Sequence, residues 1–237
     1  MKEGIQNEDI YEYSEDRYEY IVDFLNRNLK ADANIIEVGC GSGNILKYIG
    51  EKTNIKNLYG IDISEKALTV ARKRGAHTYL GSITDKSFIS GIKIKFDFVI
   101  LGAILHHLAG KNRETSYFES YKAIKNSILL LKDNGYVCIL EPIFEPSFIG
   151  DLIFYVKKFI SKLTSKRVPV FGYWNNIGPP VVSYFTKDTL LKIVEHFDNI
   201  EIVEEYEKEL KRSFLMKLFF VKKRSDLTLI LRKKIDY

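Results

Sequence analysis

The chain of 237 residues is long enough for one sizeable domain, and its 46% hydrophobic residues can supply a full core. It has no apolar run long enough for a membrane-spanning helix and no apolar centre of a secretion signal near its start, and its net charge of +5 permits nucleic-acid binding without indicating it. Two cysteines, Cys40 and Cys138, show neither a disulfide framework nor zinc-ligand spacing, so we expect reduced thiols, a cytoplasmic protein and no metal.

The first part of the chain alternates amphipathic segments with short apolar runs. Ser14 is placed to cap an amphipathic helix, and the run Asn34 to Val38 then predicts a buried strand that leads into a glycine-rich turn. The further predicted elements, in chain order, are a helix from Asn44 to about Glu51, the strand LYGIDIS, a helix from Ser64 to about Arg74, the strand HTYLGS, the strand FDFVILGA, a helix from about Asn112 to Leu131, a turn at Asp133-Asn134-Gly135 and the strand YVCILEP. Apolar strands that alternate with helices indicate a parallel sheet covered on both faces.

Beyond Pro142 the alternation stops, and it resumes after residue 185. The interruption contains an apolar and basic helix from Asp151 to Leu163 and an aromatic loop, VPVFGYWNNIGPP. Thr186 can then cap a helix to about His196, and the runs IEIVEEY and LTLILRK predict the last two strands. We therefore expect one domain over residues 1–237, with a cap helix within residues 1–30 and a lid that meets the substrate over residues 143–185.

The stretch IIEVGCGSGN raises the question of which ligand the first turn holds. A pyrophosphate at a helix N-terminus calls for the spacing G-x-G-x-x-G, whereas Gly39, Gly41 and Gly43 follow G-x-G-x-G, and Asn44 stands where the third glycine would fall. Glu37 ends the apolar strand just before the turn, where its charge would repel a pyrophosphate and attract a cation. S-adenosylmethionine, which carries an ammonium and a sulfonium but no phosphate, fits that charge.

Five motifs, in this order and at these spacings, resemble the class I S-adenosylmethionine-dependent methyltransferases: IIEVGCGSGN, LYGIDIS, YLGSI, FDFVILGAILHHL and LLKDNGYVCILEP. The resemblance extends from about Asn34 to Pro142 and continues more weakly to the C-terminus. It implies an α/β fold with a Rossmann-like, seven-stranded, mostly parallel sheet whose last strand runs antiparallel. It also implies a lid inserted after strand 5, which is typical of members that act on small molecules.

The resemblance also implies which residues hold the cofactor, and Asp62, at the end of the second strand, would hold the ribose hydroxyls of either ligand type. Ser82 departs from the aspartate that the family often has after the third strand, so either Ser82 or Asp85 would accept from the adenine amino group. The remaining implied contacts are Gly39, Cys40, Gly41 and Gly43 along the methionine part, Glu37 and the Leu101 carbonyl at the ammonium, Ile63 and Ile83 at the adenine, and Asn44 and His106 at the cofactor.

Catalysis by in-line displacement mainly requires alignment, and only an acceptor with a proton to lose requires a general base. His106 and His107 follow the fourth strand and are the candidates for that base, with packing or cofactor contact as the alternative role. The residues expected to contact substrate are Tyr11, Tyr18, Phe171, Tyr173, Trp174 and Asn175. The alternative for the aromatic loop is a small satellite core.

Three functions stay open at this point. The leading one is methylation of an oxygen, nitrogen or carbon atom of a small molecule. The second is RNA or protein methylation, although the sequence has no appended RNA-binding domain, lacks an Asn/Asp-Pro-Pro-aromatic motif at Leu101 to Ile104, and gives no reason to expect a stable nucleic-acid partner. The third is a binding module without catalysis. The oligomeric state is open.

Two stretches that are both apolar and basic raise a further possibility. They are DLIFYVKKFISKLTSKR and RSFLMKLFFVKKR. Helices of this composition can lie on an anionic membrane or admit a lipid-like substrate. The alternative is an apolar stripe that packs on the sheet and leaves its lysines in water.

Overall fold

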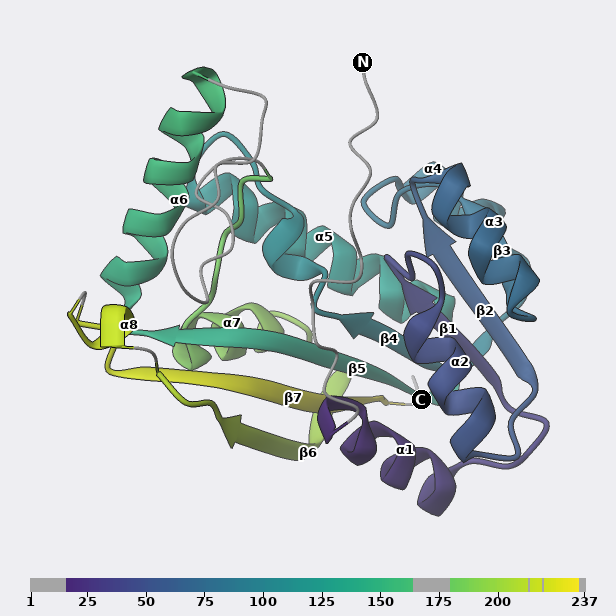
Figure 1. The fold of residues 1–237 in the computed structure, drawn as a ribbon. Helices are drawn as coiled ribbons and strands as arrows, with labels where there is room; N and C mark the ends of the chain where they lie inside the picture. The colour runs from purple at the N-terminus through teal and green to yellow at the C-terminus, as the bar shows by residue number, and fades with distance from the viewer. Residues whose placement is uncertain (1–15, 164–179, 213, 219, 235–237) are drawn as a thin grey trace.

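The computed structural model describes residues 16–163, 180–212, 214–218 and 220–234. Within them a seven-stranded sheet has the strand order β3-β2-β1-β4-β5-β7-β6 (Figure 1). The strands are β1 Asn34–Val38, β2 Asn57–Asp62, β3 His77–Leu80, β4 Phe96–Gly102, β5 Leu131–Glu145, β6 Ile200–Glu209 and β7 Lys223–Lys233. The helices are α1 Asp16–Asn28, α2 Asn44–Lys52, α3 Glu65–Lys73, α4 Lys86–Gly91, the 3-10 helix η2 Leu105–His107, α5 Arg113–Leu130, α6 Ser147–Leu163, α7 Lys187–Val194 and α8 Phe214–Leu218.

The pairing of the strands confirms the expected mostly parallel sheet. β1 pairs in parallel with β2 and β4, and β3 and β5 extend the parallel part on either side. β7 lies between β5 and β6 and runs antiparallel to both. The chain reverses its strand order at β1, so the carboxyl ends of β1, β2 and β4 open at a switch point where such sheets bind ligands.

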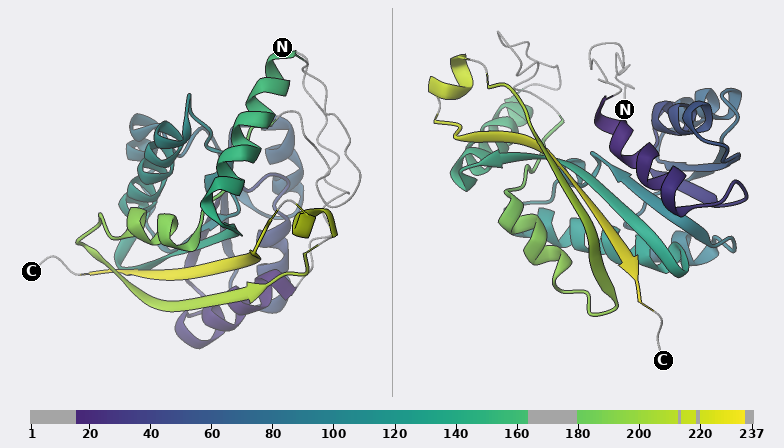
Figure 2. Two further views of the ribbon diagram at one scale, coloured as in Figure 1. Left: turned by 90° about the vertical axis from the view of Figure 1, so that its left-hand side faces the viewer. Right: turned by 90° about the horizontal axis from the view of Figure 1, so that it is seen from below.

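Consecutive residues of the central strands point into two separate cores. Ile35 of β1 packs in the core shared with α1, α2 and α3, whereas Ile36 packs in the core shared with α4, α5 and α7. Helices cover both faces of the sheet (Figure 2). Both side chains are fully buried, and burial of a side chain of this size contributes about 1.5–3 kcal/mol. Two buried faces explain why the strands are apolar throughout.

The structure differs from the predicted elements in three places. Helix α4 was not predicted; it is short, and the Asp85 side chain caps it. The expected turn at Asp133-Asn134-Gly135 lies inside β5, where Asn134 has a φ of 60° and the register with β4 shifts. Helix α6 begins at Ser147, before the predicted start at Asp151. The predicted cap Ser14 lies outside the described residues.

The described parts of the insertion lie at the carboxyl edge of the sheet. Helix α6 follows the end of β5, and the returning segment runs beside that end because the Phe144 amide donates to the Phe185 carbonyl at 3.0 Å. The Ser183 amide donates to the His106 carbonyl at 2.7 Å, which ties the same segment to the turn after β4. No helix in the described ranges has the length and hydropathy to cross a bilayer.

Candidate cofactor and active site

The glycine turn after β1 has a backbone that only glycine adopts without strain. Gly39, Gly41 and Gly43 have φ values of 68°, 51° and 76°, all in the left-handed region. The amides of Gly39 and Cys40 donate to the carbonyl of Ile61 at 2.7 and 3.0 Å, so the turn is fixed to the end of β2. Burial raises the pKa of the Cys40 thiol, which therefore stays protonated and serves packing.

Glu37 is a buried carboxylate beside this turn. Its residue is only 3% exposed, and its Oε2 atom is buried without a hydrogen-bond partner among the described residues. Burial, and after it the negative charge of Asp62, raise the pKa of the Glu37 carboxyl well above its ordinary value. A buried acceptor without a donor is unfavourable in itself, so this oxygen suits a ligand that brings a cationic donor.

Asp62 links the glycine turn to the start of α3. Its Oδ2 accepts from the Gly41 amide at 2.9 Å, and its Oδ1 accepts from the Ser64 amide at 2.8 Å. Each carboxylate oxygen has a further lone pair that could accept from a ribose hydroxyl. The neighbouring Ile63 is 77% exposed. This large apolar side chain beside the turn is therefore available to pack against an adenine ring.

Asn44, Ser82 and Asp85 all have partners within the protein. Arg74 donates to the Ser42 carbonyl at 2.9 Å and also to the side chain of Asn44, which holds the far side of the turn. The Ser82 hydroxyl bonds to Thr84 at 2.9 Å. One oxygen of Asp85 accepts from two amides at the start of α4, so this carboxylate serves as a helix cap and Ser82 remains the better candidate at the adenine.

His106 is paired with a residue that the sequence did not single out. Its Nδ1 lies 2.7 Å from Oε2 of Glu141 in β5, and Oε1 of Glu141 accepts from the Leu105 amide at 2.6 Å. Both side chains are buried. Burial raises the pKa of Glu141 to about 8 and lowers that of His106 to about 3, which favours a neutral pair in which Glu141 donates to Nδ1. His107 is exposed, with its ring centroid 4.1 Å from that of His106.

Comparisons with known proteins agree with this geometry. A family model described as a methyltransferase domain matches residues 36–137. Ribosomal protein L11 methyltransferase of Dictyoglomus turgidum is 33% identical over 84 residues, which cover 35% of this chain and 28% of that relative. An S-adenosylmethionine-dependent methyltransferase of Methanosarcina mazei superposes with a TM-score of 0.62 at 19% identity, over 90% of this chain and 98% of that one.

A third comparison concerns a structure that contains the product of the cofactor. The N-methyltransferase NodS of Bradyrhizobium japonicum, in complex with S-adenosylhomocysteine, has a TM-score of 0.55 at 15% identity, over 92% of this chain and 87% of that one. Residues 36–137 are thus similar to a methyltransferase domain, and the described chain has the fold of S-adenosylmethionine-dependent methyltransferases. The chain spans less than a third of the length of the curated relative from Dictyoglomus turgidum.

The methyltransferase fold brings together most of the residues expected at the cofactor, although their contacts with it stay predictions. Glu37, Asp62 and the glycine turn meet at the switch point, with Ile63 beside them, and Leu101 and Ile83 are buried close to the strand ends. The unpartnered Oε2 of Glu37 and the exposed Ile63 fit the ammonium and the adenine of S-adenosylmethionine, whose demethylated form is bound in the similar NodS structure.

The residues expected to contact substrate are only partly described. Tyr18 of α1 is buried, with its ring centroid 6.3 Å from that of Tyr48 in α2, so packing accounts for it and a substrate contact stays a prediction. The others, Tyr11, Phe171, Tyr173, Trp174 and Asn175, lie outside the described residues. Within the described ranges no group of His, Cys, Asp and Glu side chains has the arrangement of a metal site.

Arg113 is a second residue that the sequence did not reveal. It is buried at the start of α5, where its Nε donates to Asp151 of α6 at 3.0 Å. Its Nη1 donates to the Ser183 hydroxyl at 2.7 Å and its Nη2 to the Tyr184 carbonyl at 2.5 Å. One guanidinium thus joins α5 to both described ends of the insertion, beside the His106 turn.

Replacing Arg113 with methionine is expected to destabilise the domain by about 2 kcal/mol, because the Tyr184 carbonyl and the Ser183 hydroxyl lose a charged donor. The measurement is urea unfolding followed by circular dichroism. Arg72→Met is the matched control, since its ion pair with Glu65 is exposed and such pairs contribute roughly 0–1 kcal/mol. Equal effects of the two changes would contradict the role assigned to Arg113.

Proposed function

We propose that the protein is an S-adenosylmethionine-dependent methyltransferase that acts on a small-molecule acceptor. The observation that carries the proposal is the buried Oε2 atom of Glu37, which has no partner among the described residues and lies next to a turn with three left-handed glycines. A dinucleotide or other phosphate ligand would meet an uncompensated carboxylate there, whereas a cationic nucleoside supplies the missing donor.

The residues of this chain divide the binding of the cofactor among them. Glu37 would accept from its ammonium, Asp62 would accept from the ribose hydroxyls, and Ile63 would cover one face of the adenine. When bound, the cofactor supplies a methyl group that its positively charged sulfur makes electrophilic. The protein then has to align an acceptor and keep water away, which an insertion at the carboxyl edge of the sheet is placed to do.

Two observations support a small molecule as the acceptor. The insertion packs beside the His106 turn through the Ser183 amide, so it stands over the strand ends where an acceptor must lie. The residues after β4 are Leu101-Gly102-Ala103-Ile104, without the Asn/Asp-Pro-Pro-aromatic motif that grips a planar nitrogen in enzymes that methylate nucleic acids or proteins.

A protein acceptor is the second candidate, because the matched relative from Dictyoglomus turgidum is named for ribosomal protein L11. That similarity covers 28% of the relative, so it gives little weight to its substrate. Incubation with methyl-labelled cofactor and a cell extract, divided by ultrafiltration into small molecules and macromolecules, separates the candidates. We expect label in the low-mass fraction, and label on ribosomal proteins alone would favour the second candidate.

Cofactor binding can be tested before any acceptor is known. Calorimetry with S-adenosylmethionine and S-adenosylhomocysteine should show saturable binding to a single site on the full chain. The absence of binding at millimolar ligand would contradict the proposal as a whole and leave a binding module of another kind.

The two histidines are expected to have different roles. His107 is exposed and can meet an acceptor, whereas His106 is buried and held by Glu141, which makes it a positioning residue. His107→Ala should lower kcat roughly 100-fold if the acceptor loses a proton in the reaction, which is the scale of general-base catalysis. His196→Ala, at an exposed histidine after α7, is the control. With the acceptor found as above, an unchanged kcat in His107→Ala would exclude the base role.

A further inference from the structure

Helix α6 is apolar on two faces, and only one of them is covered. Ile149, Ile153 and Phe154 are buried beneath the helix. On the other face, Phe159 is 64% and Leu163 is 71% exposed. The exposed apolar residues recur at helical spacing and are Phe148, Leu152, Tyr155, Val156, Phe159 and Leu163. Such a stripe lies along one side of a helix and normally faces protein or lipid.

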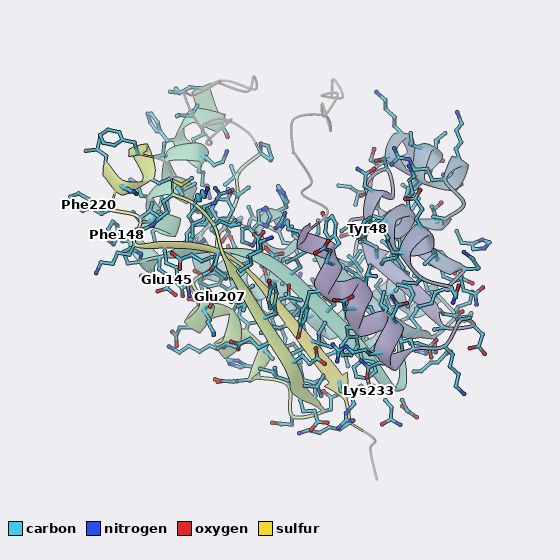
Figure 3. All side chains as sticks on the ribbon, turned by 60° about the horizontal axis from the view of Figure 1, so that its bottom comes forward. Tyr48, Glu145, Phe148, Glu207, Phe220 and Lys233 are labelled. Carbon is cyan, nitrogen blue, oxygen red and sulfur yellow. The ribbon has the colours of Figure 1, made fainter. Side chains whose placement is uncertain are left out.

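Helix α8 and Phe220, two residues after its end, continue this surface. Met216 and Val221 pack in one cluster with Ile149 and Ile153, so α8 lies against the first turns of α6. The neighbouring apolar side chains point outward: Phe214 is 78% exposed, and Leu218 and Phe220 are exposed as well. Figure 3 shows Phe148 and Phe220 at the same end of the molecule. We call the exposed apolar residues of the two helices, with Phe220, the α6–α8 patch.

Lysines border the α6–α8 patch. Lys162, Lys217 and Lys222 are exposed, and among the described residues no acidic side chain forms a salt bridge with them. Asp151, the only acidic residue of α6, is held by Arg113. The sequence from residue 211 to 223 contains five Lys or Arg residues in KRSFLMKLFFVKK and no acid.

We propose that the α6–α8 patch seats the domain on an anionic lipid bilayer. An apolar face rich in Phe and Leu and bordered by lysines is the composition of helices that lie in the membrane interface. A symmetric contact between two copies would bring together two surfaces that are both bordered by lysines, whereas phospholipid headgroups neutralise the lysines. Because α6 begins at the carboxyl edge of the sheet, the bilayer would lie on the same side as the active site. This inference does not depend on the identity of the acceptor.

The test is co-sedimentation of the full chain with vesicles at low and high salt. We expect binding to phosphatidylcholine vesicles that contain phosphatidylglycerol, weak binding to phosphatidylcholine alone, and a loss of binding as salt screens the lysines. The double variant Leu152→Asp, Phe159→Asp should lower the partition coefficient at least about tenfold, because both side chains face solvent and would enter the interface. Phe118→Asp, at an exposed phenylalanine of α5 outside the patch, is the matched control and should bind like the wild type.

Two results would overturn the proposal. One is wild-type protein that stays in the supernatant with phosphatidylglycerol vesicles, or a double variant that sediments as well as the wild type. The other is a wild-type dimer in analytical ultracentrifugation that the double variant converts to a monomer while no vesicles are bound, which would show that a second copy covers the patch. Thermal melting followed by circular dichroism confirms that each variant is folded.

Discussion

Replacing Glu37 with glutamine should weaken the binding of S-adenosylmethionine by about 2–3 kcal/mol, which is roughly a 30- to 150-fold rise in Kd. The loss follows from removing the buried negative charge that the ammonium of the cofactor would neutralise. The same change should stabilise the ligand-free domain near neutral pH, because folding of the wild type must either protonate Glu37 or bury its charge without a donor, whereas glutamine is neutral in both states. Calorimetry measures the first effect, and thermal melting without ligand measures the second.

The pH dependence of the Glu37→Gln comparison has a definite sign. Burial raises the pKa of Glu37 in the folded protein above its ordinary value of 4.5, so the folded state holds a proton that the unfolded state has lost. The wild-type free energy of unfolding should therefore fall, relative to Glu37→Gln, as the pH rises above about 4.5. The stabilisation by cofactor should change in the opposite direction, since binding requires the ionised carboxylate. Parallel melting curves from pH 5 to 8 would contradict this account.

Asp62→Ala is expected to weaken cofactor binding by about 1–3 kcal/mol. The ribose hydroxyls would lose their acceptors, and the amides of Gly41 and Ser64 would lose the carboxylate that now fixes the glycine turn. Asn112→Ala is the control, because it removes the cap of α5, which costs about 1 kcal/mol of stability, and touches nothing at the cofactor site. An unchanged Kd in Asp62→Ala would remove Asp62 from the site.

The fold could be predicted where local pattern and buried surface agree. An apolar run such as Phe96 to Gly102 has few alternatives to a central parallel strand. The spacing of the three glycines predicts the conformation of the turn, because three residues with left-handed φ values favour glycine. The antiparallel last strand came from the family resemblance. Helix α4 was missed because it is short and has little periodicity, so its cap Asp85 was the sole local signal.

The site was predictable only in part, because its inner contacts join residues far apart in the sequence. Glu141 lies in β5 and contacts His106, which follows the neighbouring strand β4. The only local sign of this role was a single acidic residue at the end of the apolar run YVCILEP. Arg113 looked like an ordinary first-turn residue of a helix, and nothing local shows that it binds the returning segment. The periodicity of α6 revealed its stripe, but only packing shows which side is left open.

The amides of Gly41 and Ser64 both donate to Asp62, so groups of the protein itself hold this carboxylate in place. A ligand therefore meets a cradle that is already shaped, and little ordering is needed on entry. The demethylated product keeps the same ammonium, ribose and adenine and loses only the sulfonium charge, so it should occupy that cradle with comparable affinity. S-adenosylhomocysteine would then compete with S-adenosylmethionine for the site. The reaction rate would depend on the ratio of the two concentrations and on how fast other enzymes remove the product.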